Sequence, residues 1–123
     1  MTIVIFAACR PAAPLNLLTG TVGVWKRTSI HEGAASGAPD PVPRTSVTRT
    51  EAAIYEGPGK LEARVYELSS PAVALDLAQR WRPSSDTVFF YGGRYFVVVK
   101  WEQAERRALQ DFIRRIEASL PAN

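Results

Sequence analysis

Residues 47–68, VTRTEAAIYEGPGKLEARVYEL, decide the fold class. On both sides of Gly57-Pro58-Gly59, successive side chains alternate between an apolar face and a mixed face, as they do in β-strands. A three-residue connection that contains glycine predicts a β-hairpin. If Glu56 and Lys60 flank this loop, one face of the hairpin is apolar and carries Ala53, Tyr55, Leu61, Ala63 and Val65. The other face is mixed and half solvated, and it carries Thr50, Ile54, Glu62, Arg64 and Tyr66.

A helix is expected directly after this hairpin. Ser70 suits an N-cap, Pro71 suits the first helical position, and Pro83 ends the helix. The stretch TVFFYGGRYFVVVKW then predicts a second hairpin with a two-residue turn at Gly92-Gly93. That turn would pair residues 88–91 with 94–97.

The last segment, residues 102–120, predicts an amphipathic helix. Its apolar residues recur at helical spacing, and they are Leu109, Phe112, Ile113, Ile116 and Leu120. Glu102–Arg106 and Asp111–Arg115 are spaced as i,i+4 ion pairs on its solvent side.

Together these elements predict an α+β fold. The expected order is β, loop, β-β-α-β-β-α, with an antiparallel sheet of about five strands and both helices on one face. Upstream, residues 15–30 predict a short strand. Residues 31–46 hold three prolines and two glycines and predict a long mobile loop. Residues 15–123 are therefore expected to form a single domain.

Both faces of the 86–101 hairpin are apolar, which marks it as a surface that something must cover. One alternative is internal cover by residues 15–30, through Leu17, Leu18, Val22 and Trp25. The other is a partner protein or a second copy of the chain. The candidate partner surface comprises Phe90, Tyr95, Val97, Val99 and Trp101.

Composition excludes several classes of protein. The net charge of +3 resides in residues 1–50, so the rest of the chain lacks the basic stripe of a nucleic-acid-binding module. No apolar run is long enough to span a membrane. One cysteine excludes an internal disulfide framework, and one cysteine with one histidine argues against a zinc site. No metal or cofactor is expected.

The N-terminal residues 1–14 predict a signal remnant followed by a tether. Phe6-Ala7-Ala8-Cys9 matches the small-small-cysteine end of a bacterial lipoprotein signal, and RPAAP suits a tether. Cys9 is thus a candidate lipidation site, and the chain is expected in the cell envelope, periplasm or medium. The segment lacks the basic residues of a complete signal. If Met1 is the true start, an ordinary strand and a cytoplasmic protein are the alternative.

No catalytic motif is present, so the sequence leaves enzymatic activity open and favours its absence. Glu51, Glu62 and Glu67 lie on neighbouring predicted strands, but the arginines among them, Arg49 and Arg64, predict cross-strand ion pairs. For a ligand-binding alternative, Arg64 and Arg94 would line a cleft beside the 31–46 loop, together with Tyr95 and Trp101.

Several motifs resemble a family of uncharacterised bacterial envelope proteins known only as a domain of unknown function. They are Gly23 with Trp25, the step Tyr66-Glu67-Leu68 followed by Ser70-Pro71 and Ala74, and Gly93-Arg94-Tyr95-Phe96-Val97. The resemblance spans about residues 15–120 and implies an N-terminal signal or lipoprotein peptide. It implies no catalytic residue.

Three functional hypotheses follow. The first is a non-enzymatic envelope-associated domain that binds a protein or glycan partner. The second is a small-molecule-binding domain or small enzyme with a cleft beside the 31–46 loop. The third is a homodimerising structural module. No nucleic-acid partner is expected, and membrane contact would occur only through an N-terminal lipid anchor.

Overall fold

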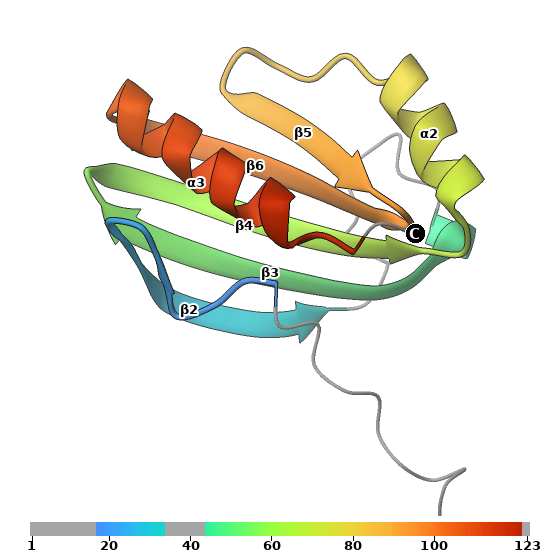
Figure 1. The fold of residues 1–123 in the computed structure, drawn as a ribbon, viewed down its shortest axis with the longest axis horizontal. Coiled ribbons are helices and arrows are strands. Elements are labelled where there is room, and N and C mark those ends of the chain that lie inside the picture. Colours follow the sequence, from blue (N-terminus) through green and yellow to red (C-terminus); the bar gives the residue numbers. More distant parts are fainter. Residues whose placement is uncertain (1–16, 34–43, 122–123) are drawn as a thin grey trace, which may run out of the picture.

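The computed structural model describes residues 17–33 and 44–121, and the predicted signal, Cys9 and most of the predicted loop lie outside these ranges. The elements are β1 (Thr21–Val22), β2 (Trp25–Gly33), a 3-10 turn (Arg44–Ser46), β3 (Val47–Gly57), β4 (Gly59–Leu68), α2 (Pro71–Arg80), β5 (Thr87–Gly92), β6 (Tyr95–Ala104) and α3 (Arg106–Ser119). The strands form one antiparallel sheet in the order β1-β2-β3-β4-β6-β5 (Figure 1).

The α+β antiparallel fold is confirmed, but the sheet has six strands rather than about five. The additional strand is β1, whose two residues fold back on β2 through a turn at Gly23, where φ is +60°. The predicted loop also begins too early, because residues 31–33 belong to β2 and pair with residues 50–52 of β3.

The first hairpin has the predicted register. Glu56 pairs with Lys60, and Tyr55 pairs with Leu61, so Gly57 and Gly59 flank a tip formed by Pro58. Gly59 has a φ of +140°, a conformation that residues with a side chain rarely adopt. The two glycines therefore allow the reversal that the sequence predicted.

The second hairpin turns one residue later than predicted. Gly92 pairs with Tyr95, so Gly93 and Arg94 form the turn, and Gly93 has a φ of +58°. Moving a turn by one residue shifts every cross-strand pair by two, so each side chain stays on its predicted face. The predicted pairs are wrong, and the predicted faces are correct.

Each helix packs against a different set of strand residues. In β6, Val97 and Val99 pack with α3, whereas Phe96 and Val98 pack with α2. Successive side chains of a strand project from opposite faces, so the prediction of both helices on one face is not confirmed. We call these two sides of the sheet the α3 face and the α2 face; Figure 1 shows α3 lying across the former.

The α3 face holds the larger part of the core. Trp25, Tyr55 and Phe112 meet there, with the rings of Tyr55 and Phe112 edge-on and their centroids 4.9 Å apart. On the α2 face, Phe89 stacks between Trp81 and Phe96, at centroid distances of 5.3 and 5.1 Å. One helix for each face explains why both sides of the second hairpin are apolar.

Candidate functional site

The predicted partner surface lies mostly inside the core. Phe90, Val97 and Val99 are buried in the cluster that includes α3, and Tyr95 and Trp101 are half-buried beside it. Leu17, Leu18, Val22 and Trp25 belong to the same cluster, but β1 and β2 lie at the opposite edge of the sheet from β5 and β6, so cover of the hairpin by residues 15–30 is not shown. Helix α3 covers the centre of this surface instead.

The two candidate ligand-contacting arginines do not converge. Arg64 lies on the α2 face and forms an ion pair with Glu62, with Nε 3.4 Å from Oε1. Arg94 is exposed in the β5–β6 turn, where its carbonyl accepts a hydrogen bond from the Leu68 amide. Because Trp101 lies at the opposite end of β6 from Arg94, these residues do not line one cleft.

Of the three predicted carboxylates, only Glu62 lies on the other side of the sheet. It projects from the α2 face, whereas Glu51 and Glu67 share the α3 face with Tyr95 and Arg49. Glu67 accepts hydrogen bonds from Arg49 Nε and from the Tyr95 hydroxyl, each at 3.1 Å. An ion pair of the predicted cross-strand kind therefore joins Arg49 and Glu67, and this network joins three strands, whereas Arg64 pairs with Glu62 on its own strand.

The Glu67 network also affects a phenol. Burial and the hydrogen-bonded, negatively charged Glu67 raise the pKa of Tyr95 above its ordinary value of 10.0. The neutral phenol is therefore retained as a donor to Glu67. This arrangement stabilises the end of the sheet.

A mostly apolar groove lies between α3 and the β5–β6 hairpin. It arises because β5 begins at Thr87, opposite Lys100, whereas β6 continues to Ala104. Positions 106, 109, 110 and 113 of α3 repeat at helical spacing and form the opposite wall. This α3 groove has a volume of about 340 Å³ and is lined by Val88, Trp101, Ala104, Arg106, Leu109, Gln110 and Ile113.

The lining of the α3 groove retains accessible apolar surface. Val88, Trp101, Ala104 and Ile113 pack on the core but are only partly buried. A volume of about 340 Å³ is comparable with small-ligand sites and can hold one or two apolar side chains. The sequence placed Ile113 on the apolar side of its helix but did not predict the groove, because strand lengths, and hence the residue at which β5 begins, could not be predicted.

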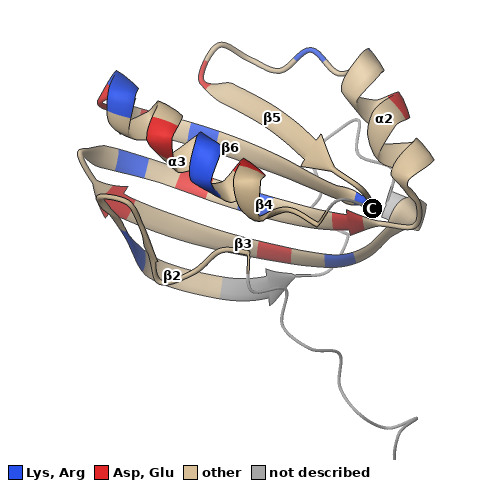
Figure 2. Ribbon diagram, viewed as in Figure 1, with Lys and Arg blue, Asp and Glu red and all other residues tan. Residues whose placement is uncertain are grey.

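The polar rim of the α3 groove comes from the first turns of α3. Arg106 and Gln110 are exposed there, and the first turn holds no acidic residue. Glu105 caps the helix by accepting hydrogen bonds from the amides of Arg107 and Ala108 at 3.1 and 3.0 Å. These bonds lower the pKa of Glu105 below its ordinary value of 4.5. Figure 2 shows basic and acidic residues interspersed along α3.

A second hollow, of about 280 Å³, lies between β3, β4 and the end of β6. Its lining carries both signs of charge and comprises Ile54, Lys60, Leu61, Glu62, Lys100, Trp101 and Glu102. It is more polar than the α3 groove and is not formed by the predicted pair Arg64 and Arg94.

The described residues contain no cluster of His, Cys, Asp or Glu that could hold a metal ion. Within the same ranges, none of the helices combines the length and apolar character needed to cross a bilayer. Compared with known protein families, with curated proteins and with solved structures, the chain matches none of them.

Proposed function

We propose that this chain is a non-enzymatic, envelope-associated domain that binds a segment of a partner protein in the α3 groove. The observation that carries the proposal is the partly exposed apolar lining of that groove, to which β6 contributes Trp101 and α3 contributes Ile113. Aromatic and aliphatic anchors that enter such a pocket supply most of the affinity of many protein interfaces.

A protein segment suits the α3 groove better than a glycan does. Sugar hydroxyls need several hydrogen-bonding groups, and the lining offers polar side chains only at Arg106 and Gln110. The apolar walls instead favour a leucine-like or aromatic side chain. Val88, near the start of β5, lines one side of the groove. The apolar side chain of the partner would therefore enter beside Val88.

Binding can be tested with a displayed library of random linear peptides selected on the full chain. We expect peptides that share an apolar anchor and that lose at least roughly tenfold in affinity on Ile113→Asp. The matched control is Leu75→Asp, because Leu75 is an exposed apolar residue of α2. Thermal unfolding of each variant verifies that it is folded.

A second variant keeps the test decisive if Ile113→Asp unfolds the domain. Ala104→Leu adds apolar volume to the groove without a charge, so it should exclude the anchor and preserve the fold. Selected peptides that bind both groove variants as tightly as they bind the wild type would exclude the α3 groove as the binding site.

The envelope location rests on Phe6-Ala7-Ala8-Cys9 and on the proline-containing tether that follows it. Expression of the full-length gene in a bacterial host, followed by fractionation and N-terminal mass analysis, tests it. The expected product begins at a lipid-modified Cys9 in the membrane fraction. An unmodified Met1 in the cytosolic fraction contradicts the location and leaves the groove proposal intact.

A further inference from the structure

The lining of the α3 groove includes one charged side chain, that of Arg106. The other residues that line it are apolar, apart from the neutral Gln110. Arg106 is exposed at the first position of α3. It takes part in none of the ion pairs or side-chain hydrogen bonds that the described residues form with one another. A partner that enters the groove therefore meets a guanidinium that is available for pairing.

The structure removes the partner that the sequence assigned to Arg106. Glu102 and Arg106 are spaced as an i,i+4 pair, but residue 102 belongs to β6, and α3 begins only at residue 106. The predicted pair is therefore wrong, because such pairs need both residues on one helix. Glu102 lines the second hollow instead, together with Lys60 and Lys100.

Glu105, the acidic residue next to Arg106 in the chain, is also engaged elsewhere. Its Oε2 accepts the Arg107 amide at 3.1 Å, and its Oε1 accepts the Ala108 amide at 3.0 Å. Glu105 is not part of the groove lining. The groove therefore presents one positive charge beside apolar walls, a combination that is complementary to a segment with an apolar side chain and a negative charge.

The helical spacing relates Arg106 to the apolar part of the groove. Positions 106, 109, 110 and 113 lie along one side of α3. At about 1.5 Å per residue, Arg106 and Ile113 are about 10 Å apart along the helix axis. An extended peptide covers that length in about three residues. An anchor seated between Ile113 and Val88 would thus lie two to four residues from a group that reaches Arg106.

We infer that the segment bound in the α3 groove carries an aspartate or glutamate two to four residues from its apolar anchor, and that this carboxylate pairs with Arg106. Arginine suits the task because its guanidinium can donate two parallel hydrogen bonds to one carboxylate. A segment with lysine or arginine at those positions would meet a like charge and bind more weakly. The inference rests on the proposed function, since it specifies the partner of the same groove.

Peptides selected on the full chain provide the first measurement. Aligned on their apolar anchors, they should be enriched in Asp or Glu two to four positions from the anchor and depleted in Lys and Arg there. A library without this enrichment, among peptides that do bind the groove, would overturn the inference.

The affinity of one selected acidic peptide provides the second measurement. The peptide is synthesised with both ends blocked, so that no terminal charge contributes. Arg106→Gln should bind it roughly three- to fivefold more weakly than the wild type does, as expected for a partly exposed ion pair. Arg107→Gln is the matched control, because Arg107 is exposed in the same turn of α3 but does not line the groove. Its affinity should equal that of the wild type.

A charge exchange separates a direct pair from a structural effect. Arg106→Glu should bind the acidic peptide more weakly still. It should also bind a peptide whose acidic residue is replaced by lysine more tightly than the wild type binds that peptide. Thermal unfolding of each variant verifies that it is folded.

Failure of this inference differs from failure of the groove proposal. Peptides that lose affinity on Ala104→Leu but bind Arg106→Gln as tightly as the wild type would overturn the acidic partner and leave the groove as the binding site. Peptides that bind Ala104→Leu and Ile113→Asp as tightly as the wild type would overturn the groove proposal, and the inference with it.

Discussion

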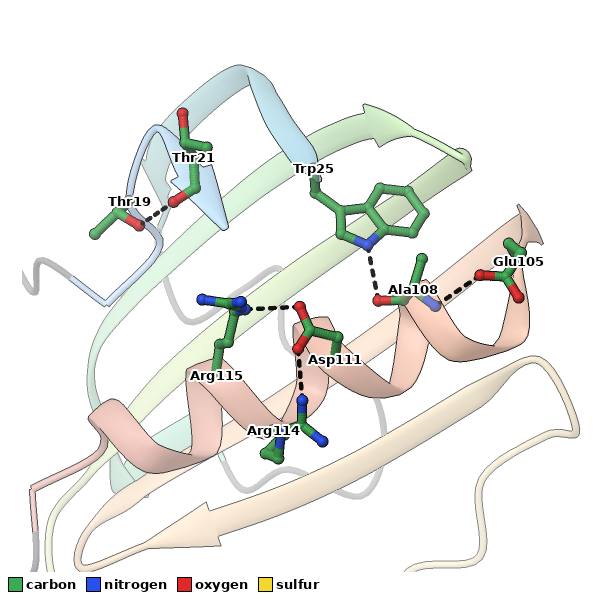
Figure 3. Close-up of polar contacts among 8 residues, drawn as sticks. All are labelled: Thr19, Thr21, Trp25, Glu105, Ala108, Asp111, Arg114 and Arg115. Carbon is green, nitrogen blue, oxygen red and sulfur yellow. Dashed lines mark hydrogen bonds and ion pairs between the residues drawn. The ribbon is translucent and has the colours of Figure 1, made fainter. Parts of the chain in front are cut away.

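The indole Nε1 of Trp25 donates a hydrogen bond of 2.9 Å to the backbone carbonyl of Ala108, which lies 83 residues further along the chain (Figure 3). Trp25 is fully buried and also meets the ring of Phe112 edge-on. One side chain at the start of β2 thus positions the first turns of α3, the same turns that form the rim of the α3 groove.

Trp25→Phe should therefore destabilise the domain by about 2–4 kcal/mol. The smaller ring leaves a cavity and removes the indole donor to the Ala108 carbonyl. Urea unfolding monitored by circular dichroism measures the loss. Trp81→Phe is the control, since Trp81 is half-buried and stacks on Phe89. Equal losses for the two variants would contradict the role assigned to the Trp25 bond.

Gly59→Ala should be among the most damaging small substitutions. A Cβ at residue 59 would lie 1.9 Å from the Gln103 carbonyl oxygen, and the φ of +140° is strained for alanine. The neighbouring Pro58 carbonyl accepts the Glu105 amide at 3.0 Å, so the hairpin tip cannot move away without disturbing the start of α3. We expect a loss of about 3 kcal/mol or more in the free energy of unfolding.

Gly20→Ala is the matched control for that substitution, because no atom lies within 4 Å of the added Cβ. Its effect should stay within roughly 0.5 kcal/mol of the wild type. If Gly59→Ala is equally mild, the hairpin tip is not packed against β6 as described.

The sequence predicted a turn correctly where neighbouring residues alone determine its position, and it failed where contacts with distant residues determine it. Glu56 and Lys60 pair as expected, because the glycines on both sides of Pro58 restrict where the chain can reverse. The pair Gly92-Gly93 allowed the turn to be formed either by residues 92 and 93 or by residues 93 and 94. The observed turn, at residues 93 and 94, is fixed by distant contacts: the Leu68 amide donates to the Arg94 carbonyl, and Gly92 packs against Leu120.

The helix positions and the α3 groove needed three-dimensional information. The short link from β4 to α2 can lead to either face of a sheet, and the apolar residues on both faces of the second hairpin did not say which helix covers which. Leu109 and Ile113 share one apolar stripe in the sequence, yet only Leu109 is buried. The difference arises because Ile113 lines the α3 groove, which opens where β5 begins at Thr87 while β6 continues to Ala104.

Alkaline pH should destabilise the domain through Tyr55. Burial raises the pKa of Tyr55 to about 12, Arg27 opposes the rise, and Glu51 adds to it. The folded state therefore favours the neutral phenol, whose hydroxyl donates to the Thr19 carbonyl. This contribution is complete below pH 10, the ordinary pKa, and is lost as pH rises toward 12.

The expected slope from this one group is up to about 1.4 kcal/mol per pH unit. Urea unfolding between pH 9 and 12 measures it, and phenolate absorbance follows the ionisation. Tyr55→Phe should be less stable at neutral pH, because it lacks the bond to Thr19, but its stability should fall less steeply above pH 10. A slope that is unchanged in Tyr55→Phe would assign the alkaline transition to other groups.

Acid should weaken the contact between α3 and the β1–β2 turn through Asp111. Arg115 Nε and Arg114 Nη2 each lie 2.6 Å from a different oxygen of this carboxylate (Figure 3). The Arg115 hydrogen bond, followed by the charges of both arginines, lowers the pKa of Asp111 below its ordinary value of 3.8. The folded state therefore favours the charged carboxylate, which stabilises the domain above that value and ceases to do so as pH falls through the lowered pKa.

Asp111→Asn should consequently lower the thermal midpoint at neutral pH and flatten its dependence on pH below 4. Gly23 packs directly against this carboxylate, since a Cβ there would lie 2.6 Å from Asp111 Oδ2, so the loss should also increase amide exchange in β1. Asp76→Asn is the matched control, because Asp76 pairs with Arg80 at 3.0 Å on exposed α2 and contacts no turn. Thermal unfolding from pH 2 to 7 and hydrogen exchange at pH 7 measure both effects. An exchange rate in β1 that rises equally in the two variants would show that the Asp111 pair does not hold the turn.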